Sequence, residues 1–184
     1  MVTGTARPEL ERLLAREKIR ECIARLARAE DRRCDQRIGL CLWPDACVDL
    51  GVFSGSFREY QNWAIAGSKA VTLMQHTLGQ TLMTLKTDQA AAETHVTIYL
   101  RSRCDGGGQR DLVMGGRYLD KLEQRGDEWR ILERTMLHDW HHDLGAAPDW
   151  RNGLLGAPLA GDHYVGRTFD DFSEDFFDRF LAEE

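Results

Sequence analysis

The sequence predicts an α+β domain in which helices come first and one curved, mostly antiparallel sheet follows. Over roughly the first third of the chain, apolar residues recur at steps of three and four, as one face of a helix requires. Farther along, four β-rich runs are separated only by short turn segments, and connections this short join antiparallel neighbours. The chain of 184 residues is long enough for one domain with both a core and an internal cavity.

The first predicted element is a long amphipathic helix over residues 8 to about 31. Its apolar face is formed by Leu10, Leu13, Leu14, Ile19, Cys22, Ile23, Leu26 and Ala27. Pro8 suits the first turn, because the N–H that proline lacks has no partner at that position of a helix. The sheet must fold around this helix to bury its apolar stripe.

Three shorter elements are predicted between this helix and the β-rich half. A second helix covers about residues 35–42 and ends at Trp43-Pro44. The run ACVDLGVF, residues 46–53, is a predicted strand, since it is rich in apolar residues and is closed by Gly and Ser. A third helix follows over about residues 56–66.

The β-rich half is predicted to form four long strands in a meander. They cover about residues 72–85, 91–104, 110–124 and 128–141. The segments between them, KTDQ, DGGGQ and QRGDE, are typical of tight turns. Helices followed by such a meander give an α+β layout rather than a series of βαβ units.

Residues 143–184 are predicted to form a C-terminal extension to the main domain, which covers residues 1–142. The part up to about residue 168 is rich in Gly, Pro and Asp and lacks periodicity, which indicates a long surface excursion. The end is predicted to be a helix with most of its phenylalanines on one face: Phe169, Phe172, Phe176, Phe177 and Phe180. Such a face either docks on the body of the domain or packs on a neighbouring subunit.

Composition and charge exclude several classes of protein. Lys and Arg number 24 against 30 Asp and Glu, a formal charge of −6, whereas a general nucleic-acid binder needs a clustered basic surface. No stretch reaches the roughly 20 apolar residues that span a bilayer, and the N-terminus lacks the apolar segment of a signal peptide. The five cysteines have no CxxC spacing, so we expect reduced thiols in a cytoplasmic protein.

A histidine and two acids are the first candidates for chemistry. His76 interrupts an apolar stretch early in the first meander strand, and it needs a partner before it can serve as a base. On a helical wheel the apolar stripe of the first helix continues to Glu30 near its centre and Asp31 near its edge. One acid is therefore expected to point toward the enclosed side. Alternatively, both acids are surface charges at the helix end that meet Arg32 or Arg33.

The histidine-rich end of the last strand does not predict a metal site. The cluster consists of residue types that bind metals: His138, Asp139, His141, His142 and Asp143. The pleat of a strand sends neighbouring side chains to opposite faces, and no second group of ligands has a recognised spacing. No Gly-rich phosphate loop and no GxSxG motif occurs in the sequence, so no cofactor is predicted.

Four segments across about residues 10–141 resemble one known family. They are IRECIARLARAEDRRCD, LWPDACVDLG, MQHTLGQT and GGRYLDKLEQRGDEWRILERTMLHDW. This pattern is similar to the SnoaL-like branch of the nuclear transport factor 2-like superfamily, which includes scytalone dehydratase, bile-acid 7α-dehydratase and hexachlorocyclohexane dehydrochlorinase. The resemblance implies a cone-shaped fold, with a strongly curved sheet wrapped around three N-terminal helices and a deep pocket between them. It also implies a cofactor-independent lyase that forms homotrimers, with a homodimer as the alternative.

The resemblance assigns roles to particular residues. By position, Asp31 is similar to the family acid and His76 to the base that this acid orients. A carboxylate that accepts a hydrogen bond from one imidazole nitrogen leaves the other nitrogen free to remove a proton. The tyrosines that relatives use near the acid and on the first strand are absent, because Leu26, Glu30 and Leu50 stand there. The proton donor for a leaving group must therefore come from elsewhere.

Further candidates for substrate binding or proton donation are Tyr118, Arg134, Tyr99 and Trp43. The family's pocket-facing polar positions fall near the two tyrosines, and a family arginine corresponds to Arg134. A tyrosine hydroxyl can donate a proton, and a guanidinium can stabilise an enolate. Tyr99 shares a strand face with His95. The sequence does not decide whether that face lines the pocket or the outer surface, where trimers of this family make contacts.

The predicted function is a lyase that eliminates water or another small fragment from a cyclic or aromatic small molecule, with His76 and Asp31 as the catalytic pair. The enzyme alternatives are an isomerase or cyclase of ketosteroid or polyketide type and a C–C lyase that releases formaldehyde from a lignin-type aromatic diol. A noncatalytic binding or assembly module is the alternative from another class, since a fold does not imply a function. A facing Asp31 and His76 inside a cavity would favour the enzyme.

Overall fold

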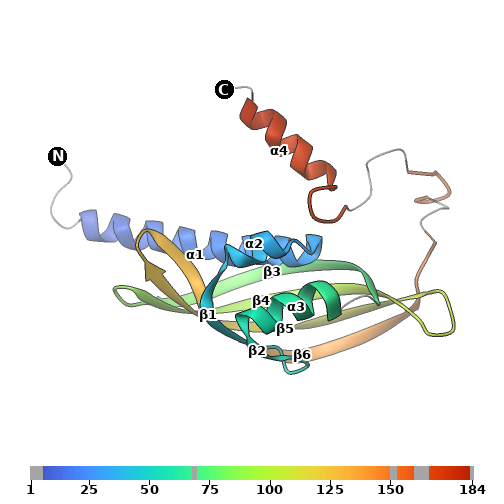
Figure 1. The fold of residues 1–184 in the computed structure, drawn as a ribbon, viewed down its shortest axis with the longest axis horizontal. Helices are drawn as coiled ribbons and strands as arrows, with labels where there is room; N and C mark the ends of the chain where they lie inside the picture. The colour runs from blue at the N-terminus through green and yellow to red at the C-terminus, as the bar shows by residue number, and fades with distance from the viewer. Residues whose placement is uncertain (1–5, 68–69, 150–152, 160–165, 183–184) are drawn as a thin grey trace.

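The computed structural model describes residues 6–67, 70–149, 153–159 and 166–182. Its elements in chain order are α1 (Ala6–Arg32), α2 (Asp35–Gly39), β1 (Leu42–Asp49), β2 (Ser54–Ser56), α3 (Phe57–Asn62), the π-helical segment η1 (Trp63–Gly67), β3 (Val71–Leu85), β4 (Gln89–Arg103), β5 (Gln109–Arg125), β6 (Glu128–Ala146) and α4 (Phe172–Ala182). A curved, unclosed six-stranded sheet follows the N-terminal helices, and one more helix lies near the C-terminus (Figure 1). The predicted α+β fold class is confirmed.

The sheet runs in the order β2-β1-β6-β5-β4-β3. The four long strands β3 to β6 pair as consecutive antiparallel neighbours, as their short turns predict, while β1 pairs with β6 in parallel. α1 contacts both β3 and β6, so the curved sheet surrounds its buried face (Figure 1). The candidate site lies in the space between this helix and the sheet.

α1 buries only the part of its apolar stripe that faces the sheet. Ile19 and Leu26 are completely buried, whereas Leu10 is 52% exposed and Leu13 is 63% exposed. The apolar stripe predicted from the sequence therefore runs along the whole helix, but only its C-terminal part belongs to the core. The first turn of α1 extends past the end of the sheet (Figure 1).

β1 begins at Leu42, earlier than the predicted strand over 46–53, and it includes Pro44. The pairing of β1 with β6 shifts register between Leu42 and Cys47. Pro44 fits this irregularity because no ladder N–H is needed there. The second helix is correspondingly shorter than predicted, Asp35–Gly39.

α3 begins at a capping box, in which Ser56 and Glu59 exchange hydrogen bonds. The box satisfies backbone groups at the helix start and fixes where α3 begins. Tyr60, one residue later, is 2% exposed and belongs to the core around α1. This short helix therefore carries an aromatic side chain to the end of α1.

The C-terminal extension is attached to the helices through ion pairs. Glu174 in the first turn of α4 pairs with Arg28 and Arg37, and Asp171 pairs with Arg32. Beyond this attachment α4 stands away from the sheet (Figure 1). The phenylalanines of this segment are about half exposed: Phe169 before the helix, and Phe172, Phe176, Phe177 and Phe180 within it. Arg28 and Arg37 also lie over the rings of Phe177 and Phe169, at 5.9 and 5.4 Å from the ring centroids. The rest of the described chain leaves much of the apolar face uncovered, and the predicted docking of that face on the body or on a neighbouring subunit stays a prediction. Parts of the predicted excursion, 150–152 and 160–165, lie outside the described residues.

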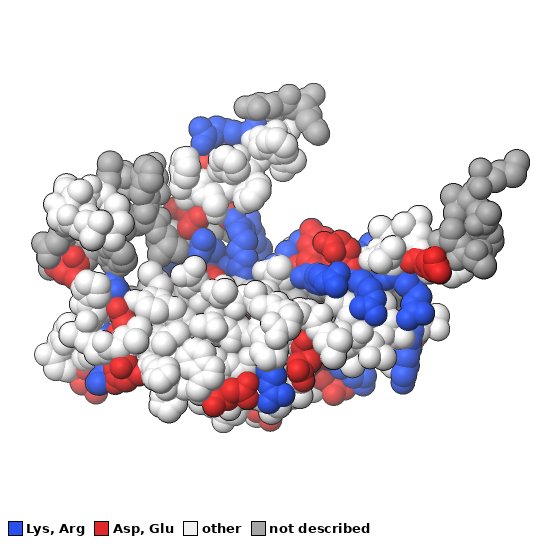
Figure 2. Space-filling view, turned by 180° about the vertical axis from the view of Figure 1, so that it is seen from behind, with Lys and Arg blue, Asp and Glu red and all other residues white. Residues whose placement is uncertain are grey.

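The surface seen in Figure 2 carries acidic and basic side chains next to one another, around a broad uncharged area. Lys and Arg are not gathered into a single basic surface on this face. Among the helices that the structure describes, none is long and apolar enough to cross a membrane.

Candidate active site

The last turn of α1 presents two acids, Glu30 and Asp31, to the sheet. Arg33 adopts a left-handed backbone conformation, with φ of 54°, which ends the helix. The N–H of Cys34 donates to the carbonyl of Ala29 at 2.9 Å, and the N–H of Arg33 donates to the carbonyl of Glu30 at 3.1 Å. These two bonds form a Schellman motif, which closes the turn and fixes the direction of both acids.

The carboxylate of Asp31 contacts both the backbone N–H and the imidazole of His76 on β3. Oδ1 of Asp31 lies 2.7 Å from Nδ1 of the imidazole, and the backbone N–H of His76 donates to the same carboxylate at 3.1 Å. The His76 side chain is only 3% exposed. A carboxylate at Nδ1 favours the tautomer with a proton on that nitrogen, so Nε2 is the nitrogen left for chemistry. The structure thus brings together the two residues that the sequence predicts as a pair.

Glu30 lies at the other nitrogen of the same imidazole. Its Oε2 is 3.4 Å from Nε2 of His76. Its Oε1 accepts a hydrogen bond from the hydroxyl of Tyr60 on α3 and lies 3.9 Å from Nη1 of Arg134 on β6. The sequence argument selects Asp31 over Glu30, whereas the structure places both acids against the histidine, one at each ring nitrogen.

Arg134 is enclosed behind this cluster. Its Nε and Nη2 donate to the two carboxylate oxygens of Asp120 at 2.7 and 2.8 Å, across the paired strands β5 and β6. Its guanidinium carbon lies 4.0 Å from the ring centroid of Tyr118. Burial alone would lower the pKa of Arg134, but Asp120 and Glu30 outweigh burial and hold that pKa above its ordinary value. Among the described residues, Nη1 has no hydrogen-bond partner.

Two tyrosines complete the polar side of the site. Burial raises the pKa of both Tyr60 and Tyr118 well above the ordinary tyrosine value, and the charge of Glu30 raises it further. Both phenols therefore stay protonated and can donate hydrogen bonds. The ring centroids of Tyr118 and His76 are 6.2 Å apart.

This cluster borders a cavity of about 300 Å³ between the helices and the sheet. Its polar lining comes from Glu30, Tyr60, His76, Tyr118 and His138. The larger side chains of the remaining lining are apolar: Leu50, Val52, Trp63, Val71, Met74, Ile98, Leu100, Met114 and Met136. An apolar cavity with a few convergent polar groups is typical of a small-molecule site. Asp31 lies behind His76 and does not itself line the cavity.

Tyr99 does not lie in this cavity. β4 turns Ile98 and Leu100 inward, where they line the cavity, so strand alternation puts Tyr99 and His95 on the opposite face. There the Tyr99 hydroxyl accepts a hydrogen bond from Nη2 of Arg101 at 3.2 Å. The strand face that carries His95 and Tyr99 is therefore the outer one, which the sequence alone does not decide. The expectation that Tyr99 faces the pocket is wrong.

Trp43 also lies outside the cavity. Its indole N–H donates to the carbonyl of Glu123 at 3.0 Å, and the guanidinium carbons of Arg125 and Arg130 each lie 4.7 Å from its ring centroid. Its ring is thus covered by two arginines, and the expectation that Trp43 contacts the substrate in this cavity is wrong. Arg134 does not line the cavity either, but it contacts two residues that do, Tyr118 and Glu30.

The histidine-rich end of β6 spreads its side chains over both faces of the strand. His138 lines the cavity, with Nε2 2.9 Å from the carbonyl oxygen of Leu50. Asp139 pairs instead with Arg117. Within the part of the chain that the structure describes, no three His, Cys, Asp or Glu side chains gather as metal ligands would.

Two residues of the cluster, Tyr60 and Asp120, are not among the sequence candidates, and Glu30 is there only as an alternative acid. The helical wheel already indicates Glu30, because it lies near the centre of the buried stripe. Strand register could have indicated Asp120, which lies directly opposite Arg134. Tyr60 gives no such signal, since the orientation of a short helix is set by packing against distant elements.

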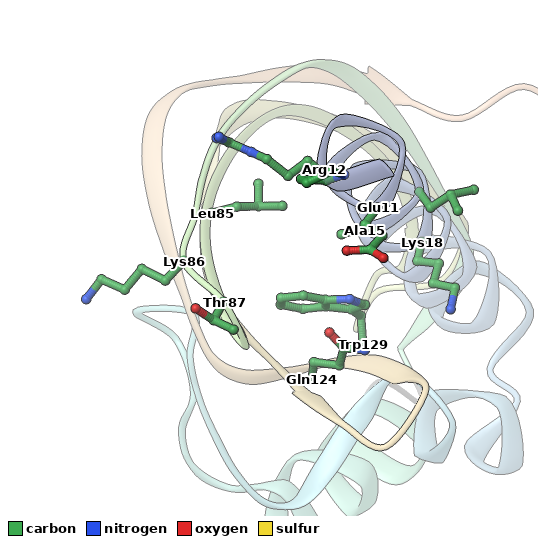
Figure 3. A pocket seen from close by; sticks show the side chains of 11 residues that line it. Glu11, Arg12, Ala15, Lys18, Leu85, Lys86, Thr87, Gln124 and Trp129 are labelled. Carbon is green, nitrogen blue, oxygen red and sulfur yellow. The ribbon is translucent and has the colours of Figure 1, made fainter. Parts of the chain in front are cut away.

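A larger hollow of about 640 Å³ lies near the N-terminal half of α1. Figure 3 shows the indole of Trp129 projecting into it, with Arg12 extending along its edge. Its charged lining residues have both signs: Glu11, Arg12, Lys18 and Lys86. This hollow has no histidine and no buried acid in its lining, so size alone does not identify the candidate site.

Comparison with known proteins supports a family assignment. A model of the SnoaL-like domain matches residues 11–135. No curated protein sequence matches the chain. Similar solved structures include a type 2 hexachlorocyclohexane dehydrochlorinase, with a TM-score of 0.67 and 15% identity over 85% of this chain and 99% of that chain.

Two further structures have the same fold. A putative scytalone dehydratase from Novosphingobium aromaticivorans has a TM-score of 0.63 and 15% identity, over 74% of this chain and 94% of that chain. A nuclear transport factor 2-like superfamily protein from Salmonella enterica has a TM-score of 0.60 and 15% identity, over 67% of this chain and 90% of that chain. At these identities the likeness shows the fold and not the activity. The family model spans the helix end, the histidine strand and most of the sheet, and the chain therefore belongs to the SnoaL-like domain family.

Proposed function

We propose that this protein is a cofactor-independent lyase that eliminates water or another small fragment from a cyclic or aromatic small molecule. The observation that carries the proposal is the 2.7 Å contact between Asp31 and Nδ1 of His76 at the wall of an apolar cavity. A buried pair of an acid and a histidine next to an apolar cavity costs folding free energy. A binding module gains nothing from such a pair, whereas an enzyme can use it to transfer a proton. The pair is therefore best explained by proton transfer.

In the proposed reaction His76 is the base. Asp31 keeps a proton on Nδ1, so the lone pair of Nε2 removes a proton from a substrate carbon. The electrons of the broken C–H bond form the new double bond, and the leaving group departs with the electrons of its own bond. Asp31 stabilises the imidazolium that results.

The size and lining of the cavity support a small, ring-containing substrate. A volume of about 300 Å³ and a lining rich in Met and Leu suit a small neutral compound built on one ring or two. The protonated hydroxyl of Tyr118 can donate to a carbonyl or hydroxyl oxygen of that ring. Arg134, packed under the Tyr118 ring, adds a fixed positive charge near this hydroxyl.

A second candidate is an isomerase of ketosteroid type, which Tyr118 favours. An isomerase needs the same base and a donor that holds the oxygen of an enolate, but it needs no donor for a leaving group. The ring centroids of Tyr118 and His76 lie 6.2 Å apart and both residues line the same cavity, so one bound substrate could contact the phenol and the imidazole together. Product analysis separates the candidates, since only elimination changes the mass of the substrate.

The test is a panel of cyclic alcohols, β-hydroxy ketones and aromatic diols, with products identified by mass spectrometry. We expect the wild-type protein to convert at least one member, and His76→Ala to lower turnover by on the order of 10² to 10⁴. His95→Ala is the matched control, because His95 lies on the outer face of β4. Unchanged turnover in His76→Ala would remove this residue from the mechanism.

We also propose that the chain assembles as a homo-oligomer, with a trimer favoured over a dimer. The support is the family resemblance and the largely exposed phenylalanines of α4. Light scattering during size-exclusion chromatography tests this directly, and a monomer at every concentration would contradict it.

A further inference from the structure

We propose that Glu30 is the second catalytic acid of this site, which shares one proton with Nε2 of His76 and delivers it to the leaving group. This proposal deepens the lyase mechanism and rests on it. Glu30 lines the cavity, whereas Asp31 and Arg134 do not. It is therefore the one carboxyl group of the described cluster that a substrate can touch.

The first argument is geometric. Both nitrogens of His76 face carboxyl oxygens, Nδ1 at 2.7 Å from Asp31 and Nε2 at 3.4 Å from Glu30. A bare nitrogen lone pair and a bare carboxylate are both acceptors, so facing each other at this distance they repel. A proton between them turns the repulsion into attraction, whether it resides on the nitrogen or on Oε2.

The second argument is the balance of charge. Three acids lie in this cluster, Glu30, Asp31 and Asp120, against the single fixed cation of Arg134. Arg134 directs Nε and Nη2 to Asp120, and its remaining Nη1 is 3.9 Å from Oε1 of Glu30. Unbalanced negative charge beside an apolar cavity is costly, so an additional proton at the pair of His76 and Glu30 stabilises the folded protein.

The surroundings of Glu30 fix which oxygen carries that proton. The hydroxyl of Tyr60 from α3 donates to Oε1, and Arg134 of β6 is nearest to the same oxygen. Oε2 therefore remains available to share a proton with His76 of β3 and to contact a ligand in the cavity. Tyr118 of β5 lines the same cavity. Tyr60 therefore acts as a positioning residue, because it holds the carboxyl group without touching the reacting atoms.

The other possible donors are weaker. Burial raises the pKa of Tyr60 and Tyr118 well above the ordinary value, so both phenols hold their protons tightly. A carboxylic acid gives up its proton far more readily than a phenol does. The donor that the sequence leaves unassigned is therefore the residue next to Asp31 in the chain.

The proton balance closes within the site. In the reacting state the shared proton is on Oε2 of Glu30, so Nε2 of His76 has a free lone pair. Nε2 takes a proton from carbon, the C–H electrons form the C=C bond, and the C–O bond breaks toward oxygen. The departing oxygen takes its proton from Oε2 of Glu30 and leaves as water. The imidazolium and the carboxylate that remain are neighbours at 3.4 Å, so transfer of one proton from Nε2 to Oε2 restores the starting state.

The shared proton can be tested without a substrate. In protein labelled with ¹⁵N-histidine at neutral pH, we expect the Nε2 signal of His76 to lie between the values of an unprotonated and a protonated ring nitrogen, because Nε2 accepts the proton that it shares with Oε2 of Glu30. In Glu30→Gln it should move to the value of an unprotonated nitrogen, while Nδ1 stays protonated. His76→Gln assigns the signals, and Glu174→Gln is the matched control, because Glu174 is buried against Arg28 and Arg37 away from the cavity. An unprotonated Nε2 in the wild type, unchanged in Glu30→Gln, would overturn the proposal.

The donor role is tested with two substrates that have the same ring, one with a hydroxyl and one with a halide as leaving group. Glu30→Gln should slow loss of the hydroxyl by on the order of 10² to 10⁴ and slow loss of the halide much less, since halide departs without a proton. Equal losses for both substrates contradict the donor role. If the wild type converts no panel member, the proposed function fails and the donor role with it, while the spectra still decide whether the proton is shared.

Discussion

The two ends of α1 border two different hollows of the molecule, and these hollows differ in the side chains that line them. At the N-terminal half the hollow is about 640 Å³, and the nearby Leu13 is largely exposed. At the C-terminal end a cavity of about 300 Å³ has Glu30 and His76 in its wall, both nearly buried. Charges away from water depend on their neighbours, because an unpaired buried charge costs several kcal/mol. In this fold, the gathering of buried polar side chains identifies the candidate site, and the volume of a hollow does not.

The largest expected effect comes from a substitution in the candidate site at the C-terminal end of α1. Asp31→Asn should lower kcat/KM on a panel substrate by on the order of 10² to 10⁴, because the amide no longer selects the required tautomer of His76. Glu11→Gln makes the same kind of change in the same helix at the larger hollow, and we expect it to leave kcat/KM unchanged. A wild-type rate for Asp31→Asn would restrict that residue to a structural role, and equal losses in both variants would remove the distinction between the two ends.

A large loss of stability is expected from Arg134→Met. The substitution leaves Asp120 and Glu30 without their cation, which should lower the free energy of unfolding by about 3 to 5 kcal/mol. Chemical denaturation followed by circular dichroism measures this loss. Lys121→Met is the control, because its pair with Glu133 is exposed and screened by solvent, so its effect should be much smaller. If adding Asp120→Leu to Arg134→Met recovers no stability, uncompensated charge is not the cause.

Leucines in the apolar stripe of α1 allow the two ends of the helix to be compared without a change of charge. Leu26→Ala should cost about 2 to 5 kcal/mol of unfolding free energy, because this side chain is completely buried. Leu13→Ala should change it by less than about 0.5 kcal/mol, because that side chain is mostly in solvent. Denaturation at several protein concentrations checks both values. A loss for Leu13→Ala that grows with protein concentration would show that another copy covers this end of the helix.

Local patterns were sufficient to predict the helices and the four long strands, because the period of apolar residues and the turn residues are set within each segment. The pairing of Asp31 with His76 was also predictable, but from a family resemblance rather than from spacing. The face of Tyr99 was not, since both faces of β4 carry residues that could be buried and only the covering helices decide between them. The contact of Glu30 with Nε2 depends on the orientation of α3 and β6 around one helix end, and no single segment encodes that arrangement.

The smallest effect concerns alkaline pH and the two tyrosines of the site. In the unfolded chain Tyr60 and Tyr118 ionise near the ordinary pKa of 10.0, whereas their folded pKa values lie well above it. Their contribution to stability is fully present below about pH 10. Above it the unfolded state binds fewer protons than the folded state, so each tyrosine lowers the free energy of unfolding by about 1.4 kcal/mol per pH unit until the folded group ionises.

Phenylalanine at both positions removes this linkage, so the fall of unfolding free energy between about pH 10 and pH 11 should become smaller by about 2 kcal/mol. Denaturation curves at each pH for wild type and for the double variant measure the difference in slope. The described lining of the larger hollow includes no tyrosine, so the change in slope reports on the C-terminal end of α1. An equally steep fall in the double variant would mean that these phenols ionise normally, and the site would then be wetter than its burial implies.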